Sequence, residues 1–140
     1  MNKVQLEQYV VLELGKELFA LKIYDIHEVI RLQKITEMHH QDPSVKGVIN
    51  LRGRIVPIIS LRKRFGLEEI PPTKSTRIMV LNYKDDMVGM VVDSVSKVTQ
   101  FTEIQPPPEM VNESEEHFFE GIGETDGELV SILRIASIFN

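Results

Sequence analysis

The stretch GVINLRGRIVPIISLRKRF, residues 47 to 65, decides the fold because an altered version of it follows 74 positions later. That second version reads GIGETDGELVSILRIASIF, residues 121 to 139, and aligns with the first without a gap. Glycines at matched positions in a long ungapped register predict an internal repeat. The residues shared between the two versions are Gly47 with Gly121, Gly53 with Gly127, Val56 with Val130, Ile58 with Ile132 and Phe65 with Phe139.

The repeat continues upstream. Shifting the sequence by 69 positions lays residues 9 to 32 over residues 78 to 101, with apolar residues coinciding throughout. The offset changes within residues 105 to 117, a proline-rich and acidic stretch that predicts a loop. We therefore expect one domain over residues 4 to 139, built from barrel one at about 9 to 68 and barrel two at about 76 to 139, with strand exchange between them left open.

Each repeat predicts a series of short strands. Apolar runs at residues 9 to 14 and 18 to 21 flank a turn-prone segment, which is a hairpin signal. A second hairpin turns at Arg52-Gly53, echoed by Asp126-Gly127, a pair that favours a type I′ turn with positive φ angles. Pro57 indicates a sheet edge or bulge, and residues 26 to 30 fit either a helical turn or a bent strand. Four or five strands per repeat, each series followed by a short helical turn, suffice for two small closed β-barrels.

Composition limits the function classes. The 140 residues are 42% hydrophobic and 26% charged, which is ordinary for a globular protein. The net charge of −5 argues against a dedicated nucleic-acid binder. The absence of cysteine excludes disulfides, thiol catalysis and thiolate metal sites. No apolar run is long enough to cross a bilayer or resembles a signal peptide, so we expect a soluble, cytoplasmic chain without direct membrane insertion.

No enzyme, cofactor or metal signature stands out. His39 and His40, with His27, Glu37, Asp42 and His117, form the best metal candidate, but adjacent strand residues point to opposite faces. Ser60 lacks the turn that exposes a nucleophile, and no glycine-rich phosphate cradle is present. The acidic pairs, including Glu115-Glu116, are typical of a solvated surface. The sequence therefore predicts a non-enzymatic protein without a metal or cofactor.

Five basic residues crowd the opening stretch. They are Arg52, Arg54, Arg62, Lys63 and Arg64. A nucleic-acid surface would need further phosphate contacts and stacking aromatics. The alternatives are a solubilising surface, and a protein-binding face in which fixed charges set partner choice.

Arg52 is replaced by Asp126 in the second repeat, and Glu28 is replaced by Lys97. Both charges change sign together, which is the pattern that a structural ion pair would leave. We therefore predict a Glu28–Arg52 pair and a reversed Lys97–Asp126 counterpart. Breaking the first pair would cost about 3–5 kcal/mol if it is buried and at most about 1 kcal/mol if it is exposed.

The segments DIHEVIRL, VKGVINLRGRIVPIISLRKRFGL, MVGMVVDSVSKV and FFEGIGETDGELVSILRI resemble the CheW-like domain family. The resemblance covers nearly the whole chain, and the N-L-R-G segment in this setting is specific. It implies an all-β fold with short helical segments, in which two SH3-like five-stranded barrels pack around a shared core. This agrees with the repeat, which stands independently of the family.

The resemblance also implies a function. Members of the family that hold only this domain are scaffolds that couple chemoreceptors to the histidine kinase CheA in bacterial chemotaxis. One barrel face would meet the kinase's regulatory domain, and a groove between the barrels would meet the receptor's cytoplasmic hairpin tip. The chain would be monomeric alone and would assemble with these partners into arrays at membrane-associated receptors. Positions matching the family's contact residues are Ile26, Glu28, Val29, Gly47, Asn50, Leu51, Arg52 and Gly53, and Val88, Val91 and Val92 as groove residues.

Two alternatives stay open. A CheW-like coupling protein of another two-component pathway, such as surface motility, would carry the same sequence features. A nucleic-acid-binding β-barrel would use the basic cluster instead. The sequence also leaves open which receptors are served, the sign of kinase regulation, and which contact residue belongs to which partner.

Overall fold

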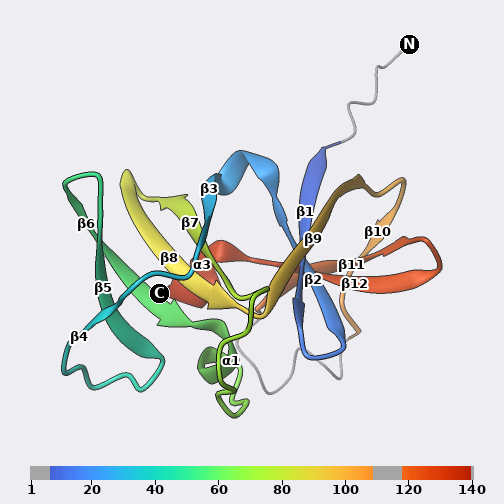
Figure 1. Ribbon diagram of the computed structural model, residues 1–140. Coiled ribbons are helices and arrows are strands. Elements are labelled where there is room, and N and C mark those ends of the chain that lie inside the picture. Colours follow the sequence, from blue (N-terminus) through green and yellow to red (C-terminus); the bar gives the residue numbers. More distant parts are fainter. Residues whose placement is uncertain (1–6, 109–117, 140) are drawn as a thin grey trace. The chain divides into compact units, whose positions relative to one another are not determined.

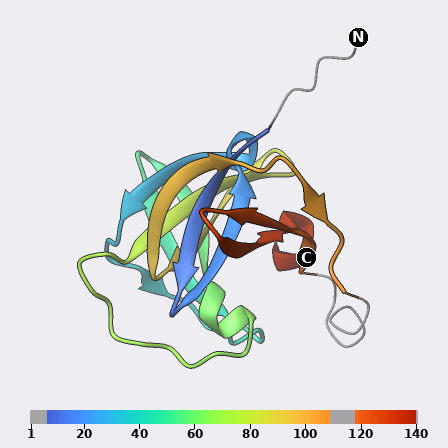
Figure 2. The ribbon, with the colours of Figure 1, turned by 90° about the vertical axis from the view of Figure 1, so that its right-hand side faces the viewer.

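The computed structural model describes residues 7–108 and 118–139, drawn in two views in Figures 1 and 2. Its contacts divide the chain into two compact units. The middle unit is Asp25–Val95, and the terminal unit joins Met1–Tyr24 to Ser96–Asn140. His117 and the Glu115-Glu116 pair lie outside the described residues.

The described part of the middle unit contains one six-stranded sheet in the order β3-β7-β8-β6-β5-β4 (Figure 1). Its strands pair in antiparallel fashion except for β6 and β8, which run parallel. The bounds are β3 (Ile26–Arg31), β4 (Thr36–Glu37), β5 (Val45–Leu51), β6 (Arg54–Ser60), β7 (Arg77–Tyr83) and β8 (Asp86–Val92).

The described part of the terminal unit contains a second six-stranded sheet in the order β10-β11-β12-β2-β1-β9 (Figure 2). Its parallel pair is β12 with β2. The bounds are β1 (Gln8–Leu14), β2 (Glu17–Lys22), β9 (Ser94–Gln100), β10 (Ile104–Gln105), β11 (Phe119–Thr125) and β12 (Glu128–Leu133).

The two sheets are built by the same rule. Ile58 of β6 pairs with Gly89 of β8, and Ile132 of β12 pairs with Ala20 of β2. The repeat offsets of 74 and 69 convert the first pair into the second. Each sheet therefore combines the second hairpin of one repeat with the first hairpin of the other repeat. Each has six strands rather than five, because the two-residue strands β4 and β10 extend the sheet beyond β5 and β11.

The recurring glycines have two different structural reasons. Arg52 and Gly53 have φ angles of 51° and 90°, and Asp126 and Gly127 have 53° and 79°, so both turns need two residues with positive φ. Gly47 instead allows a close approach, because a Cβ built there would lie 1.9 Å from the carbonyl oxygen of Thr36 on β4.

Four recurring apolar residues lie in the cores, whereas the recurring Phe65 and Phe139 are half-buried. Val56, Val130, Ile58 and Ile132 are fully buried. The middle core also contains Ile49, Leu51, Ile78, Val80 and Met87, and the terminal core contains Tyr9, Val11, Ala20 and Phe101. Strands that alternate between buried and exposed residues place one face on such a core and leave the other available to partners.

Short helical segments complete the fold, as the sequence predicted. The α1 helix (Leu61–Arg64) begins where the Ser60 hydroxyl accepts a hydrogen bond from the backbone N–H of Lys63, at 3.2 Å. Its counterpart after β12 is α3 (Ile135–Phe139), and η1 is a 3₁₀ turn at Ile23–Asp25. Residues 26 to 30, left open by periodicity, form strand β3 with an irregular register between Ile26 and Glu28.

Candidate functional site

The turn between β5 and β6, which we call the NLRG turn (Asn50–Gly53), is held by its own residues. The Asn50 side-chain oxygen accepts a hydrogen bond from the backbone N–H of Gly53, at 2.9 Å. Leu51 is buried in the middle core at 6% exposure, which anchors the turn from inside. Arg52 has a positive φ angle that is uncommon for a residue with a Cβ. The four residues thus present the Arg52 side chain outward from a fixed position.

Arg52 contacts Glu28 and so connects the two edges of the sheet. Nη2 of Arg52 donates to Oε1 of Glu28, which lies on the edge strand β3, whereas the NLRG turn lies near the opposite edge. The side-chain amide of Gln33 also donates to the Asn50 carbonyl oxygen, at 3.4 Å. These contacts close the sheet on itself. The Arg52 side chain is 65% exposed, so the pair belongs to the exposed class, worth at most about 1 kcal/mol.

The terminal unit has the same closure with reversed charges. Nζ of Lys97, on the edge strand β9, donates to Oδ2 of Asp126 in the β11–β12 turn. The hydrogen bond and the positive charge of Lys97 hold the pKa of Asp126 below its ordinary value. Both units therefore have opposite charges at these two positions, and the polarity of the pair differs between them.

Two further arginines of the basic cluster pair with carboxylates. Arg62 donates to Asp93 through Nε at 2.9 Å and Nη2 at 2.7 Å, in a geometry that matches the planar carboxylate. The hydrogen bond to Asp93 raises the pKa of Arg62 above its ordinary value. Nη1 of Arg64 lies 3.3 Å from Oδ2 of Asp42. Together with the Arg52–Glu28 pair, these contacts compensate three of the five basic charges within the middle unit. The cluster is therefore less suited to binding the phosphates of a nucleic acid.

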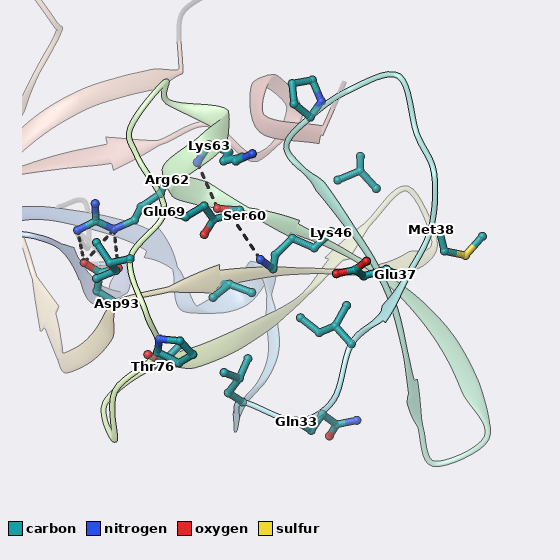
Figure 3. A pocket seen from close by; sticks show the side chains of 17 residues that line it. Gln33, Glu37, Met38, Lys46, Ser60, Arg62, Lys63, Glu69, Thr76 and Asp93 are labelled. Atoms are coloured by element: carbon teal, nitrogen blue, oxygen red, sulfur yellow. Dashed lines mark hydrogen bonds and ion pairs between the residues drawn. The ribbon is translucent and has the colours of Figure 1, made fainter.

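A groove of about 500 Å³ opens beside the Arg62–Asp93 pair (Figure 3). Leu32, Ile35 and Val91 line it together with a second ion pair, Lys46 to Glu69, at 3.4 Å. Among the described residues no group of three His, Asp or Glu side chains is arranged to hold a metal ion. The groove is thus lined by apolar side chains, by these two ion pairs, and by the charged side chains of Glu37 and Lys63.

The outer face of β5, β6 and β8 carries exposed apolar side chains. Ile55 is 63% exposed, Pro57 is exposed, and both alternate along β6 with the buried Val56 and Ile58. We call this surface the β5–β6 face; it comprises Val48, Asn50, Ile55, Pro57 and Val88. Val48 pairs with Pro57 and Asn50 pairs with Ile55 in the strand register. Val88 joins them because it precedes Gly89, which faces the core beside Ile58.

Comparisons with known proteins agree with this geometry. The family model described as "CheW-like domain" matches residues 8–140.

The chain belongs to the CheW-like family.

Relatives of this CheW-like chain are similar over most of its length. It is 33% identical to "Chemotaxis protein CheW" of Helicobacter pylori, covering 94% of this chain and 80% of that protein. It is 31% identical to "Probable chemotaxis protein CheW" of Rhizobium etli, covering 95% and 87%. The crystal structure of the scaffolding protein TtCheW from Thermoanaerobacter tengcongensis superposes with a TM-score of 0.89, at 36% identity, covering 97% of this chain and 94% of that one.

The positions expected to bind partners fall into two groups in the CheW-like fold. Val29, Asn50, Arg52 and Gly53 are exposed, and Ile26, Glu28, Val88 and Val91 are half-buried. Leu51, Gly47 and Val92 are buried, with Val92 at 1% exposure. A partner would not reach these last three residues without a rearrangement, so they support the site rather than form its surface.

Sequence reasoning missed Ile55 and Pro57 as surface residues. A run of β6 residues that is apolar at nearly every position predicts a buried strand on both faces. The one available signal was Pro57, but the sheet edge predicted from it is wrong, because β6 lies between β5 and β8. Pro57 is tolerated there because the pairing of β6 with β8 begins only at Ile58. No helix among the described residues is long and apolar enough to cross a membrane.

Proposed function

We propose that this chain is a non-enzymatic adaptor that couples chemoreceptors to the histidine kinase CheA in bacterial chemotaxis. The match to the scaffolding protein TtCheW, over nearly the full length of both chains, carries this proposal. The chain would work in the cytoplasm and be recruited to membrane-associated receptor arrays. Two separate surfaces would let one small protein link two large ones, and many such links would add up through multivalency.

The geometry supports a division of labour within the site. The β5–β6 face offers exposed apolar strand residues that suit the barrel of the kinase's regulatory domain. The NLRG turn with Glu28 and Val29 offers a charged, rigid feature beside it. The family resemblance implies a receptor groove at Val88, Val91 and the buried Val92, and that assignment stays a prediction. Val88 belongs to both sets, because β8 lies directly beside β6.

The first experiment measures binding of the purified chain to a CheA regulatory domain and, separately, to a receptor cytoplasmic fragment, by calorimetry. We expect both partners to bind at micromolar concentration. Ile55→Asp should weaken kinase binding at least tenfold, because an exposed apolar anchor near the centre of an interface contributes roughly 1–2 kcal/mol or more. The matched control is Leu129→Asp, the equivalent position of the other repeat, which is 69% exposed. If the unaltered chain bound neither the kinase domain nor the receptor fragment, the proposed adaptor function would be overturned.

A second experiment separates the two roles of Arg52. Arg52→Asp should weaken binding, and Glu28→Lys combined with Arg52→Asp recreates the polarity found in Lys97–Asp126. If the double variant regains binding, the pair acts by closing the barrel. If it regains stability but not binding, a partner recognises the positive charge of Arg52 itself.

A further inference from the structure

Two arginines lie directly opposite each other on neighbouring strands of the middle unit. Arg31 of β3 pairs with Arg77 of β7 in the antiparallel register. Directly paired residues point to the same face of a sheet, with their Cβ atoms about 4.5–5.5 Å apart. Like charges at such positions repel each other and destabilise the sheet.

The second repeat has no charge at the equivalent positions. The repeat offset of 69 places Gln100 at the position of Arg31 and Gln8 at the position of Arg77. Gln8 lies on β1 and Gln100 on β9, which are neighbouring strands of the terminal sheet. The same strand arrangement is therefore built without the two positive charges, which points to a role for them outside the fold.

Arg77 is held in place by main-chain acceptors. Its Nη1 donates to the carbonyl oxygens of Lys74 and Thr76, at 2.9 Å each. Both belong to a turn that is closed by two hydrogen bonds between Thr73 and Thr76, at 2.9 Å and 3.2 Å. The turn places the exposed Lys74 next to Arg77, so a third positive charge belongs to this end of the sheet.

No carboxylate neutralises these three side chains. Within residues 7–108 and 118–139, Arg31, Lys74 and Arg77 take part in no ion pair. The carboxylate of Asp93, one residue beyond the strand partner of Arg77, is bound by Arg62 at 2.7 Å. Arg31 is exposed and Arg77 is half-buried, so a ligand from solvent can reach both.

We propose that Arg31, Lys74 and Arg77, which we call the arginine cluster, bind a phosphate dianion, either free or as a monoester. A guanidinium donates two parallel hydrogen bonds to the oxygens of a phosphate. Two guanidinium groups on one face can hold a phosphate between them, and its two negative charges offset their mutual repulsion. A carboxylate would neutralise only one of the two arginines, so the charge count favours phosphate.

The test is calorimetric titration of the full chain with inorganic phosphate and, separately, with O-phosphoserine, at an ionic strength held constant with sodium chloride. We expect binding at millimolar concentration. Tighter binding of O-phosphoserine would assign the cluster to a phosphorylated side chain, and equal or weaker binding would assign it to free phosphate. Free glutamate supplies the carboxylate comparison. The proposal would be overturned if glutamate bound as tightly as phosphate, or if neither phosphate compound bound.

The decisive variant takes the residue that the second repeat carries. Arg31→Gln should weaken phosphate binding at least roughly tenfold, because one bidentate, charge-assisted contact is lost. Arg31→Lys should weaken it less, because the charge remains and only the planar geometry is lost. The matched control is Arg54→Gln, the same change at an exposed arginine of β6, which should bind phosphate as the unaltered chain does. Equal losses in Arg31→Gln and Arg54→Gln would show that only the net charge matters.

Thermal unfolding gives a second readout. Without phosphate, Arg31→Gln should be at least as stable as the unaltered chain, because the repulsion with Arg77 is removed. Phosphate at about ten times its dissociation constant should raise the Tm of the unaltered chain by about 4 °C more than that of Arg31→Gln. A lower Tm of Arg31→Gln without phosphate, or an equal rise in both proteins, would contradict the proposal. The kinase and receptor are absent from these experiments, so their outcome is independent of the adaptor function.

Discussion

Gly47 and Gly53 recur together in the second repeat, yet they serve different physical needs. Gly53 supplies a positive φ angle in open space, whereas Gly47 lets β4 approach so closely that no Cβ fits. Both positions favour glycine, for reasons that a sequence pattern alone does not distinguish.

At Gly47 we predict a large loss of stability on substitution by alanine. The new Cβ would lie 1.9 Å from the Thr36 carbonyl oxygen, at a φ of 147°, and the free energy of unfolding should fall by about 3 kcal/mol or more. The control is Gly53→Asn, which meets no atom within 4 Å and should cost about 1 kcal/mol or less. Urea denaturation measures both, and equal losses would contradict the steric explanation.

At Asn50 we predict a smaller loss. Asn50→Ala removes the acceptor of the Gly53 N–H and should lower the free energy of unfolding by about 1 kcal/mol. Asn50→Asp keeps an acceptor oxygen and should stay close to the unaltered protein. Glu124→Ala, at the equivalent position of the second repeat, should change stability by less than about 0.5 kcal/mol. If Asn50→Ala and Glu124→Ala lowered the free energy of unfolding equally, the hydrogen bond from Asn50 to Gly53 would not be the cause.

At the scale of elements, the segment after β6 is fixed by ion pairs and turns. Arg62 on α1 holds Asp93, just after β8, and also donates from Nη1 to the carbonyl oxygen of Glu68, at 3.0 Å. Leu67 N–H donates to the Arg62 carbonyl oxygen, at 2.8 Å. One arginine therefore ties the short helix, the following loop and the end of β8 together.

Replacing Arg62 by Met should destabilise the chain by about 2 kcal/mol, because two charge-assisted hydrogen bonds to a largely buried carboxylate are lost. Lys63→Met, at the exposed neighbour, should alter thermal stability by less than about 0.5 kcal/mol. Calorimetric unfolding of both variants distinguishes them. If Lys63→Met were equally damaging, lost charge in general rather than the Asp93 pair would be responsible.

The loop before β5 should show a pH dependence. The backbone N–H and hydroxyl of Ser44 both donate to Asp42 Oδ1 at 2.9 Å and hold the pKa of Asp42 below its ordinary value. A lowered folded pKa means that the carboxylate stabilises the fold above its unfolded pKa of about 3.9. That stabilisation is lost as the pH falls through the lowered folded value. Asp42→Asn should therefore be less stable than the unaltered chain at pH 7, with the difference narrowing near pH 3 in parallel urea titrations. If the difference in stability between Asp42→Asn and the unaltered chain stayed constant from pH 7 to pH 3, the Asp42 carboxylate would not be the cause of the pH dependence.

At the scale of the whole molecule, the exchange of hairpins makes the two repeats interdependent. The sheet around β5 and β6 needs β7 and β8 from the second repeat, and the sheet around β11 and β12 needs β1 and β2 from the first. The family model accordingly matches residues 8–140 as one domain.

We predict that cutting the chain at the repeat boundary separates strands that need each other. Fragments of residues 1–72 and 73–140 should each be largely unfolded alone, because each lacks the parallel neighbour of its hairpins. Mixing the fragments should restore the β-sheet circular dichroism of the intact chain. Independent folding of either fragment would show that the exchanged hairpins are not required.

The sequence by itself determined the repeat, the two positive-φ turns and the short helical segments. It also indicated which charges face each other, since Glu28–Arg52 and Lys97–Asp126 changed sign together. These features are local or are copied between repeats, so one chain contains enough information to read them. The tertiary structure alone decided which hairpin joins which sheet, that Leu51 and Val92 are buried, and that Ile55 is exposed. Strand periodicity shows on which side of a strand a residue lies, but neighbours in a sheet are chosen by long-range packing, and that choice sets what remains at the surface.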